Sequence, residues 1–194
     1  MTGKFIVFYG INNLGKTTQA KLLVEKLQQN GLQAEYLKYP IYDLAPSGPI
    51  LNKYLRGGNP HELSAREAQI IYTLNRTQFE PILKDKLKNG INIISEDYVG
   101  TGLAWGIGAN VEEKFLKFIN SHLLPEDIAF LFDGERFIDS TEKNHKHETD
   151  GELLKKVREA HLRLGKELNW RKINANLSIE EIHRQILDYI QKFI

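Results

Sequence analysis

The sequence predicts an α/β fold in three layers, α/β/α, in which helices flank both faces of a parallel sheet. Short apolar runs alternate with longer helical patterns along the chain, which is typical of parallel strands joined by helices. Gly10–Thr17 fits G-x-x-x-x-G-K-[ST], a phosphate-binding loop that follows a strand and opens a helix. The 194 residues, 41% of them hydrophobic, are enough for one domain with a sizeable core. We therefore expect a single domain over residues 1–194.

The first elements are a strand, a helix and a second strand. Lys4–Tyr9 is a short apolar run and predicts a buried strand. Lys16–Asn30 carries leucines on one side and predicts a helix, for which Gly31 supplies a stop signal. Ala34–Tyr39 then predicts the second strand of the sheet.

Proline and glycine organise the next stretch. Pro40–Pro49 contains three prolines and predicts a loop. Ile50–Arg56 predicts a short helix. Ser64, with a glutamate three residues later, has the pattern of a capping box that opens a long helix toward Asn89. Pro81 lies inside that helix, where we expect it to kink or divide the helix.

The middle of the chain adds two strands and a helix. Ile91–Ser95 is rich in β-branched residues and predicts a strand. Asn110, followed by Glu113, predicts the start of another helix. Ile128–Phe132 is apolar and predicts a further strand.

The last part begins with a segment of a different kind. Residues 134–150 are polar, rich in charge and without periodicity, so we expect a lid segment there. Gly151–Leu168 predicts a helix, and Arg171–Ile173 a final strand. Ser178 has the pattern of a second capping box and opens a terminal helix that we expect to reach Ile194.

Composition excludes several classes of function. The chain has 26 basic and 25 acidic residues, so it has no global positive field with which to hold nucleic acid. It contains no cysteine, which excludes disulfides and thiolate metal sites and suits the cytoplasm. No apolar run approaches the length of a membrane span or a signal peptide. We therefore expect a cytoplasmic protein without nucleic-acid or membrane partners.

The loop Gly10–Thr17 has the chemistry of a polyphosphate site. Its successive backbone N–H groups can converge on one anion, and the N-terminus of the following helix adds about half a positive charge. Lys16 can reach the β- and γ-phosphates, and the Thr17 hydroxyl can bind Mg²⁺. We therefore predict ATP and Mg²⁺ as cofactors. The residues expected to bind ATP are Asn12, Asn13, Leu14, Gly15, Lys16, Thr17 and Thr18.

Ligands of parallel sheets gather at the carboxyl ends of the strands. The residues that follow each predicted strand are therefore the candidates for a site. They are Gly10–Thr17, Tyr39–Tyr42, Glu96–Gly102 and Asp133–Arg136.

Segments along nearly the whole chain resemble the thymidylate kinases, a family of P-loop nucleotide kinases. The most specific are the phosphate loop, which ends in TTQ, and the Asn-Arg-x-Gln motif at 75–78. The others are KYP (Lys38–Pro40), GPILNKYL (Gly48–Leu55), EDYVGTGLAW (Glu96–Trp105), LLPEDIAFLFD (Leu123–Asp133), KVREAHLRL (Lys156–Leu164) and INANLSIEEI (Ile173–Ile182). The resemblance implies a P-loop kinase fold and transfer of the γ-phosphoryl group of ATP to dTMP, which gives dTDP and ADP.

The resemblance also implies a thymine-binding site. Tyr72 would stack on the base, and Arg76 would hydrogen-bond the base edge with support from Gln78. Helical spacing independently puts Tyr72 and Arg76 on one face. Asn12 would reach the 3′-hydroxyl. The full set of implied substrate-binding residues is Asn12, Pro40, Tyr42, Tyr72, Arg76, Gln78, Tyr98, Thr101, Gly102 and Trp105.

Three positions depart from the family pattern, which has arginines there. Asp97 and Tyr42 stand at two of them, and Lys146 at the third, where lysine keeps the charge but loses the bidentate fork. Glu96 can keep the role of the family's acid and orient Mg²⁺ or its waters. The predicted catalytic residues are Lys16, Glu96, Asp97 and Lys146, and the predicted metal-binding residues are Thr17 and Glu96.

Asp97 matters for the choice of acceptor. A carboxylate about 4 Å from one phosphate charge costs roughly 1 kcal/mol in water and roughly 4 kcal/mol at an effective dielectric of 20. One alternative is therefore a deoxynucleoside kinase whose acceptor is a neutral 5′-hydroxyl, with Glu96 or Asp97 accepting the proton. Another is a nucleotide-binding module with weak transfer activity. In a third alternative, the acceptor is dTMP and a cation such as Lys38, Lys53 or Arg66 replaces the missing arginines of the family pattern.

The lid and the oligomeric state complete the expectations. Closure of the lid segment would exclude water from the reaction, and its cations would stabilise the transferred phosphoryl group. Lys143, Lys146 and Arg136 are the lid residues with that charge. The resemblance further implies a homodimer formed through helices beside the sheet.

Overall fold

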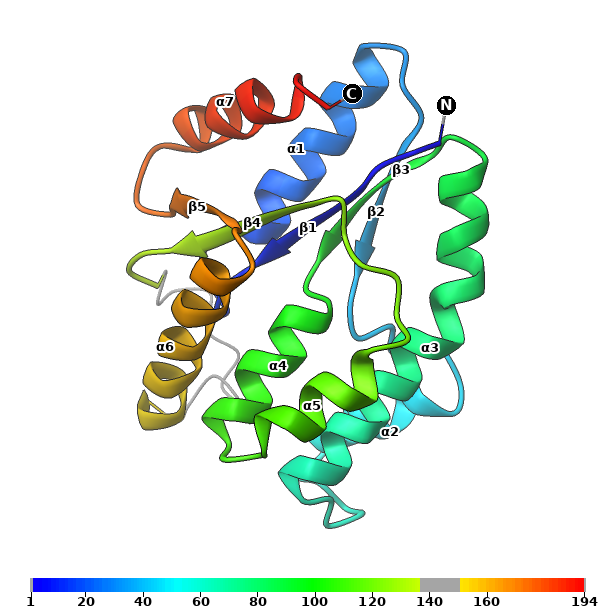
Figure 1. Ribbon diagram of the computed structural model, residues 1–194, viewed down its shortest axis with the longest axis vertical. Helices are drawn as coiled ribbons and strands as arrows, with labels where there is room; N and C mark the ends of the chain where they lie inside the picture. The colour runs from blue at the N-terminus through cyan, green and yellow to red at the C-terminus, as the bar shows by residue number, and fades with distance from the viewer. Residues whose placement is uncertain (1, 137–150, 194) are drawn as a thin grey trace.

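Five parallel strands form the centre of the molecule. The computed structural model describes residues 2–136 and 151–193. Within this part of the chain, the strands follow the order β2-β3-β1-β4-β5, and every neighbouring pair is parallel (Figure 1). Their carboxyl ends therefore meet at one edge of the sheet. The strands are β1 (Phe5–Tyr9), β2 (Ala34–Lys38), β3 (Asn92–Glu96), β4 (Ile128–Asp133) and β5 (Arg171–Asn174).

Helices cover both faces of this sheet, as predicted. One face is covered by α1 (Lys16–Gln29) and α7 (Ile179–Ile190), which contact each other. The opposite face carries α3 (Ala65–Lys88), α4 (Val99–Gly108) and α6 (Gly151–Glu167). Two shorter helices pack on that layer, α2 (Ser47–Arg56) on α3 and α5 (Glu113–Asn120) on α3 and α4. Among the described helices, none combines the length and apolar composition of a membrane span.

The core lies on both sides of the central strands. Every residue of β1 and β3 is buried. Burial on both faces of the sheet explains why β1 is a continuous apolar run rather than an alternating pattern. Phe8 of β1 packs against Phe130 and Phe132 of β4, with ring centroids 5.5 and 5.2 Å apart. Tyr9, the last residue of β1, stacks on Trp170 at 4.1 Å.

Both predicted capping boxes are present. The hydroxyl of Ser64 accepts a hydrogen bond from the backbone N–H of Glu67, and the Glu67 carboxylate accepts one from the backbone N–H of Ser64. Ser178 begins α7 in the same way. We expected Pro81 to kink or divide the long helix, and it does not divide it, because α3 runs without a break from Ala65 to Lys88. Proline removes one N–H and one helical hydrogen bond, and the packing of α3 on the sheet and α4 outweighs that loss.

Three helix boundaries lie three or four residues from their predicted positions. The helix expected to begin at Ile50 begins at Ser47, because Pro49 lies in the first turn, where backbone N–H groups have no helical partner. The helix expected to begin at Asn110 begins at Glu113, since Asn110 has a left-handed backbone (φ 60°) just after α4. The terminal helix ends at Ile190, four residues before the predicted end.

Helix α4 was not predicted from the sequence. Four of its ten residues are glycine, which lowers intrinsic helix propensity. The packing explains them, because a Cβ atom at Gly100 would lie 2.4 Å from the Trp170 ring, and one at Gly106 would lie 2.6 Å from Leu116. Tertiary packing therefore overrides propensity, and the absent side chains let α4 lie close to its neighbours.

We expect Gly100→Ala to destabilise the fold by about 1 to 3 kcal/mol, because overpacking outweighs the roughly 1 kcal/mol gain in helix propensity. Trp170 cannot move aside freely, since it is buried and stacked on Tyr9. Urea unfolding of the two proteins measures the difference. Gly151→Ala, in α6, is the matched control, since no atom would lie within 4 Å of its new methyl group. Equal stability of the Gly100→Ala protein and the parent would contradict this account of α4.

His161 is a buried histidine on the inner face of α6. It is 1% exposed, and its Nδ1 lies 3.0 Å from the carbonyl oxygen of Val157. Burial, followed by the positive charge of Lys16, lowers the pKa of His161 from 6.5 to about 3. The unfolded chain therefore takes up a proton at higher pH than the folded chain, and stability is lost as the pH falls below 6.5.

We therefore expect the parent protein to lose about 2 kcal/mol more stability than His161→Gln between pH 7.5 and pH 5. Urea unfolding at the two pH values gives the comparison. The comparison uses the change in the free energy of unfolding between the two pH values. A loss of packing in the variant lowers its stability equally at both values and therefore does not affect this difference. Parallel losses in both proteins would show that His161 does not cause the acid sensitivity.

Candidate functional site

The phosphate-binding loop leaves the end of β1 in an unusual backbone conformation. Gly10 has a φ of 130°, and a Cβ atom there would lie 2.4 Å from the carbonyl oxygen of Phe132 on β4. Asn13 and Gly15 adopt left-handed φ angles of 64° and 79°. Left-handed residues placed along such a loop turn successive N–H groups toward a common centre, directly before the positive end of α1. The loop has the geometry of an anion-binding site.

A cavity of about 300 Å³ extends from this loop to helices α3 and α4. It lies at the carboxyl edge of the sheet, where the order of strands reverses between β1 and β3. The lining consists of the phosphate loop and of residues from the segment after β2, the end of α2, the middle of α3, and the junction of β3 with α4. These residues are Asn12–Thr18, Lys38, Tyr39, Pro40, Tyr42, Leu55, Arg56, Gln69, Tyr72, Asn75, Arg76, Glu96, Asp97, Tyr98, Thr101, Gly102 and Trp105.

The structure brings all but two of the predicted site residues to this cavity. Gln78 does not line it, and its Nε2 instead donates a hydrogen bond to the carbonyl oxygen of Ala45 at 2.6 Å. Lys146 and most of the lid segment lie outside the described residues. Of the other lid cations, Lys143 also lies outside them, while Arg136 Nε donates to the carbonyl oxygen of Asn12 at 3.3 Å.

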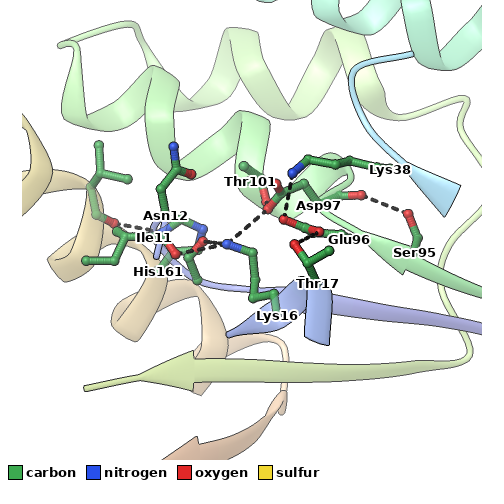
Figure 2. Close-up of polar contacts among 12 residues, drawn as sticks. Ile11, Asn12, Lys16, Thr17, Lys38, Ser95, Glu96, Asp97, Thr101 and His161 are labelled. Carbon is green, nitrogen blue, oxygen red and sulfur yellow. Dashed lines mark hydrogen bonds and ion pairs between the residues drawn. The ribbon is translucent and has the colours of Figure 1, made fainter. Parts of the chain in front are cut away.

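Three polar side chains contact Glu96, the last residue of β3. Thr17 Oγ1 donates to its Oε2 at 2.6 Å, and Lys38 Nζ lies 3.0 Å from its Oε1 (Figure 2). The Tyr36 hydroxyl also donates to Oε2, at 2.7 Å. Burial alone would raise the pKa of Glu96. The charges of Lys16 and Lys38 and the two hydrogen bonds outweigh burial and hold this pKa below its ordinary value. Glu96 is therefore a charged carboxylate beside the first residues of α1.

Asp97 has the opposite electrostatic character. Its backbone is left-handed (φ 64°), and its Oδ1 accepts a hydrogen bond from Thr101 Oγ1 at 2.9 Å. Lys16 Nζ lies 3.8 Å from the same oxygen and donates to the carbonyl oxygens of Gly10 and Ile11, both at 2.9 Å. Burial raises the pKa of Asp97 despite the nearby Lys16. The arginine expected from the family pattern is thus replaced by a carboxyl group that faces the loop lysine.

The positive charge of the cavity comes partly from a residue that the sequence did not single out. Of the three replacement cations considered, Lys38 lines the cavity, while Lys53 and Arg66 do not. Arg66 lies over the ring of Phe115, 3.4 Å from its centroid. Arg56, at the end of α2, lines the cavity, and its guanidinium lies 4.8 Å from the centroid of the Tyr42 ring. No motif marks Arg56, because its position depends on where α2 packs.

The far end of the cavity is built from α3 and α4. Arg76 is only 4% exposed, and one of its terminal nitrogens donates to Asn120 Oδ1 at 3.0 Å. Asn120, rather than Gln78, therefore holds the guanidinium. A Cβ atom at Gly102 would lie 2.5 Å from Arg76, so glycine makes room for the arginine. Tyr72 and Trp105 add aromatic surface to the same end.

Asn75 orders the segment that follows β2. Its side-chain amide exchanges two hydrogen bonds with the backbone of Ile41, at 2.8 and 2.9 Å, and its Nδ2 also donates to Ser47 Oγ at 2.9 Å. Because Ile41 lies between Pro40 and Tyr42, this contact places both residues on the cavity wall. Asn75 belongs to the Asn-Arg-x-Gln motif. Its hydrogen bonds to a segment distant in sequence explain why the motif has an asparagine at this position.

The chain matches known proteins along most of its length. The family model described as "Thymidylate kinase" matches residues 8–186. A thymidylate kinase of Plasmodium falciparum is 30% identical over 98% of this chain and 90% of its own length. A probable thymidylate kinase of Methanocaldococcus jannaschii is 29% identical, over 96% and 95%.

A solved structure gives the same result for the fold. The thymidylate kinase of Candida albicans superposes with a TM-score of 0.84, at 22% sequence identity and over 98% of this chain and 92% of its own. Together with the phosphate loop and the parallel sheet, this likeness identifies a P-loop kinase fold. With the family model matching most of its residues, the chain belongs to the thymidylate kinase family.

Proposed function

We propose that this protein transfers the γ-phosphoryl group of ATP to dTMP and releases dTDP and ADP. The observation that carries the proposal is the continuity of the cavity, which joins the phosphate loop at Lys16 to the aromatic wall and guanidinium at Tyr72 and Arg76. A kinase of this kind has to hold two anionic substrates end to end, and catalysis consists mainly of positioning and charge neutralisation. The names of the relatives, thymidylate kinase in each case, support the choice of acceptor.

The donor ATP would lie on the phosphate loop. The N–H groups of the loop and of the first turn of α1 would bind the β- and γ-phosphates. The Lys16 ammonium group would stabilise the negative charge on the γ-phosphoryl group during its transfer. The Thr17 hydroxyl and the Glu96 carboxylate are 2.6 Å apart, and oxygen donors of these two kinds suit Mg²⁺. Mg²⁺ bound there would neutralise charge on the phosphates during transfer. Arg136 contacts the same loop and adds a cation from the segment after β4.

The acceptor base would lie between α3 and α4. The ring of Tyr72 offers a face for stacking, and Arg76 offers donors to the carbonyl oxygens of a pyrimidine. Burial lowers the pKa of Arg76, which remains a cation, and its contact with Asn120 fixes its direction. A guanidinium so constrained loses little conformational entropy when the base binds.

The acceptor phosphate meets mixed charges. Lys16 and Lys38 lie next to Asp97 and Glu96, so each of these lysines is partly neutralised by a carboxyl group. Arg56 also lines the cavity and lies over the ring of Tyr42. We propose that Arg56 supplies the attraction for the acceptor's phosphate that the arginines of the family pattern supply elsewhere.

One observation favours a second candidate, a kinase of unphosphorylated deoxynucleosides. Asp97 lies on the cavity wall near Lys16, where a carboxylate repels an acceptor phosphate but can take a proton from a neutral 5′-hydroxyl. The two candidate functions differ in the charge of the acceptor, and both use ATP bound at the same phosphate loop.

The homodimer and the cytoplasmic location stay predictions. Support for a homodimer comes from exposed apolar side chains on α3 and α5, which offer a surface to a second copy of the chain. They are Ile70 (45% exposed), Leu74 (37%) and Phe118 (76%).

The deciding experiment measures ADP production with Mg²⁺-ATP while dTMP and thymidine are supplied in separate reactions. We expect turnover with dTMP at a kcat/KM at least about tenfold above that with thymidine, because binding energy from the phosphate aids transfer. Lys16→Ala is the control and should remove turnover with both acceptors, since it removes charge that stabilises the transferred group. Turnover with thymidine alone would establish the second candidate. ATP binding without turnover on either acceptor would leave a nucleotide-binding module.

The role of Arg56 gives a separate prediction. Arg56→Ala should raise the KM for dTMP about tenfold, because hydrogen bonds between charged groups contribute roughly 1.5 to 3 kcal/mol. The KM for ATP should change little. Lys53→Ala is the matched control, since it removes the same charge from the same helix at a residue that does not line the cavity. Equal effects of the two substitutions would mean that Arg56 acts through general electrostatics and not through contact with the acceptor.

A further inference from the structure

Gln69 is a buried amide side chain on the cavity wall. It lies on α3 one turn before Tyr72, and the residue is 4% exposed. Its Oε1 accepts no hydrogen bond within the described part of the chain. A buried carbonyl oxygen without a partner costs about 1 to 3 kcal/mol, so such atoms are rare in folded proteins and call for an explanation.

Asn75 and Thr101 on this wall already have hydrogen-bond partners, whereas the hydroxyl groups of Tyr39 and Tyr98, which also line the cavity, have none within the described residues. The amide of Asn75 bonds to Ile41 and Ser47. The Thr101 hydroxyl donates to Asp97, and the Thr73 hydroxyl donates to the backbone carbonyl oxygen of Gln69 itself. Between Gln69 and Arg76 on α3, Gln69 Oε1 is therefore the side-chain amide oxygen on the cavity wall that has no hydrogen-bond partner in the described chain.

Gln69 and Arg76 flank Tyr72 on one face of α3. Seven residues separate them, which corresponds to about 10 Å along the helix axis. Side chains on a helix point back toward its N-terminus, so the Arg76 guanidinium lies closer to Gln69 than the backbone positions suggest. Asn120 Oδ1 accepts from both Arg76 and Thr73, which places the guanidinium beside the turn that begins at Gln69. Arg76 Nε is a second buried polar atom without a partner here.

The edge of a thymine or uracil ring matches these groups. It presents the acceptor O4, the donor N3–H and the acceptor O2 in a row. Arg76 has donors only, whereas a carboxamide can accept and donate at once, and its oxygen and nitrogen exchange places on rotation of the terminal torsion. A ring stacked on Tyr72 therefore finds donors for O4 at Arg76 and an acceptor for N3–H at Gln69.

We propose that Gln69 binds the imide N3–H of the acceptor's pyrimidine through its Oε1 and is thereby a specificity-determining residue. This inference rests on the proposed function, because it identifies how the base of the acceptor is read. Arg76 has donors only and therefore disfavours cytosine, which carries an amino group in place of O4. Gln69 Oε1 adds a hydrogen bond from the N3 proton that thymine and uracil carry and cytosine lacks.

The test uses dTMP and its N3-methyl derivative, in which the N3 proton is replaced by a methyl group. Isothermal titration without ATP measures the dissociation constant of each. We expect the parent protein to bind dTMP at least about tenfold more tightly, because methylation removes one hydrogen bond and leaves a buried amide unpartnered. In Gln69→Met, which keeps the length of the side chain, the two constants should agree within about twofold. Gln69→Glu keeps an acceptor oxygen and should retain the discrimination.

Gln28→Met is the matched control, since it makes the same change at a glutamine on α1 whose Nε2 donates to the carbonyl oxygen of Ala34, away from the cavity. A parent protein that does not discriminate between the two ligands would overturn the inference. So would a Gln69→Met protein that binds both ligands more weakly by one common factor, because a purely structural role has that effect. Turnover is measured separately. A parent protein that discriminates in binding without phosphorylating dTMP would refute the proposed function and leave the role of Gln69 intact.

Discussion

The parallel pairing of β1 with β3 is the constraint on which the site depends. Phe8 is the register partner of Glu96, and the N–H of Asp97 donates to the carbonyl oxygen of Phe8 at 3.1 Å. This pairing sets the phosphate loop, which leaves β1, beside the two acidic residues that end β3. A shift of register by one residue would turn Glu96 to the other face of the sheet and separate it from Thr17. The positions of Lys16, Glu96 and Asp97, and of Lys38 beside Glu96, thus follow from a few backbone hydrogen bonds in the core.

The two lysines and two carboxyl groups at this edge of the sheet largely offset each other's charge, and this reduces the attraction that the lysines exert on anions. Lys16 faces Asp97, and Lys38 faces Glu96. The net field at the centre of the cavity therefore owes less to lysine than the count of basic residues suggests. The backbone N–H groups of the loop, the dipole of α1, and Arg56 and Arg76 on the cavity wall contribute the rest of the positive potential. A site of this kind depends more on geometry than on total charge, in agreement with a chain whose formal net charge is +1.

The features that sequence could predict are those that rest on local chemistry. Strong apolar runs predicted β1 and β4. Ser64 and Ser178 marked helix starts because a capping box involves residues close in sequence. The phosphate loop is equally local. In contrast, α4 is helical because its glycines meet Trp170, Arg76 and Leu116, which are distant in sequence. Arg56 and Gln69 escaped notice for the same reason, since only the packing of α2 and α3 brings them to the cavity.

The glycine at position 102 has a consequence for inhibitors of this protein. Because a methyl group there would lie 2.5 Å from the buried guanidinium of Arg76, the chain cannot add bulk at that point without displacing a residue of its own site. A small molecule that rests against this bare stretch of α4 would contact a surface on which drug resistance is hard to evolve, since enlarging the side chain harms the enzyme along with the drug. Ligand design has reason to begin at that wall.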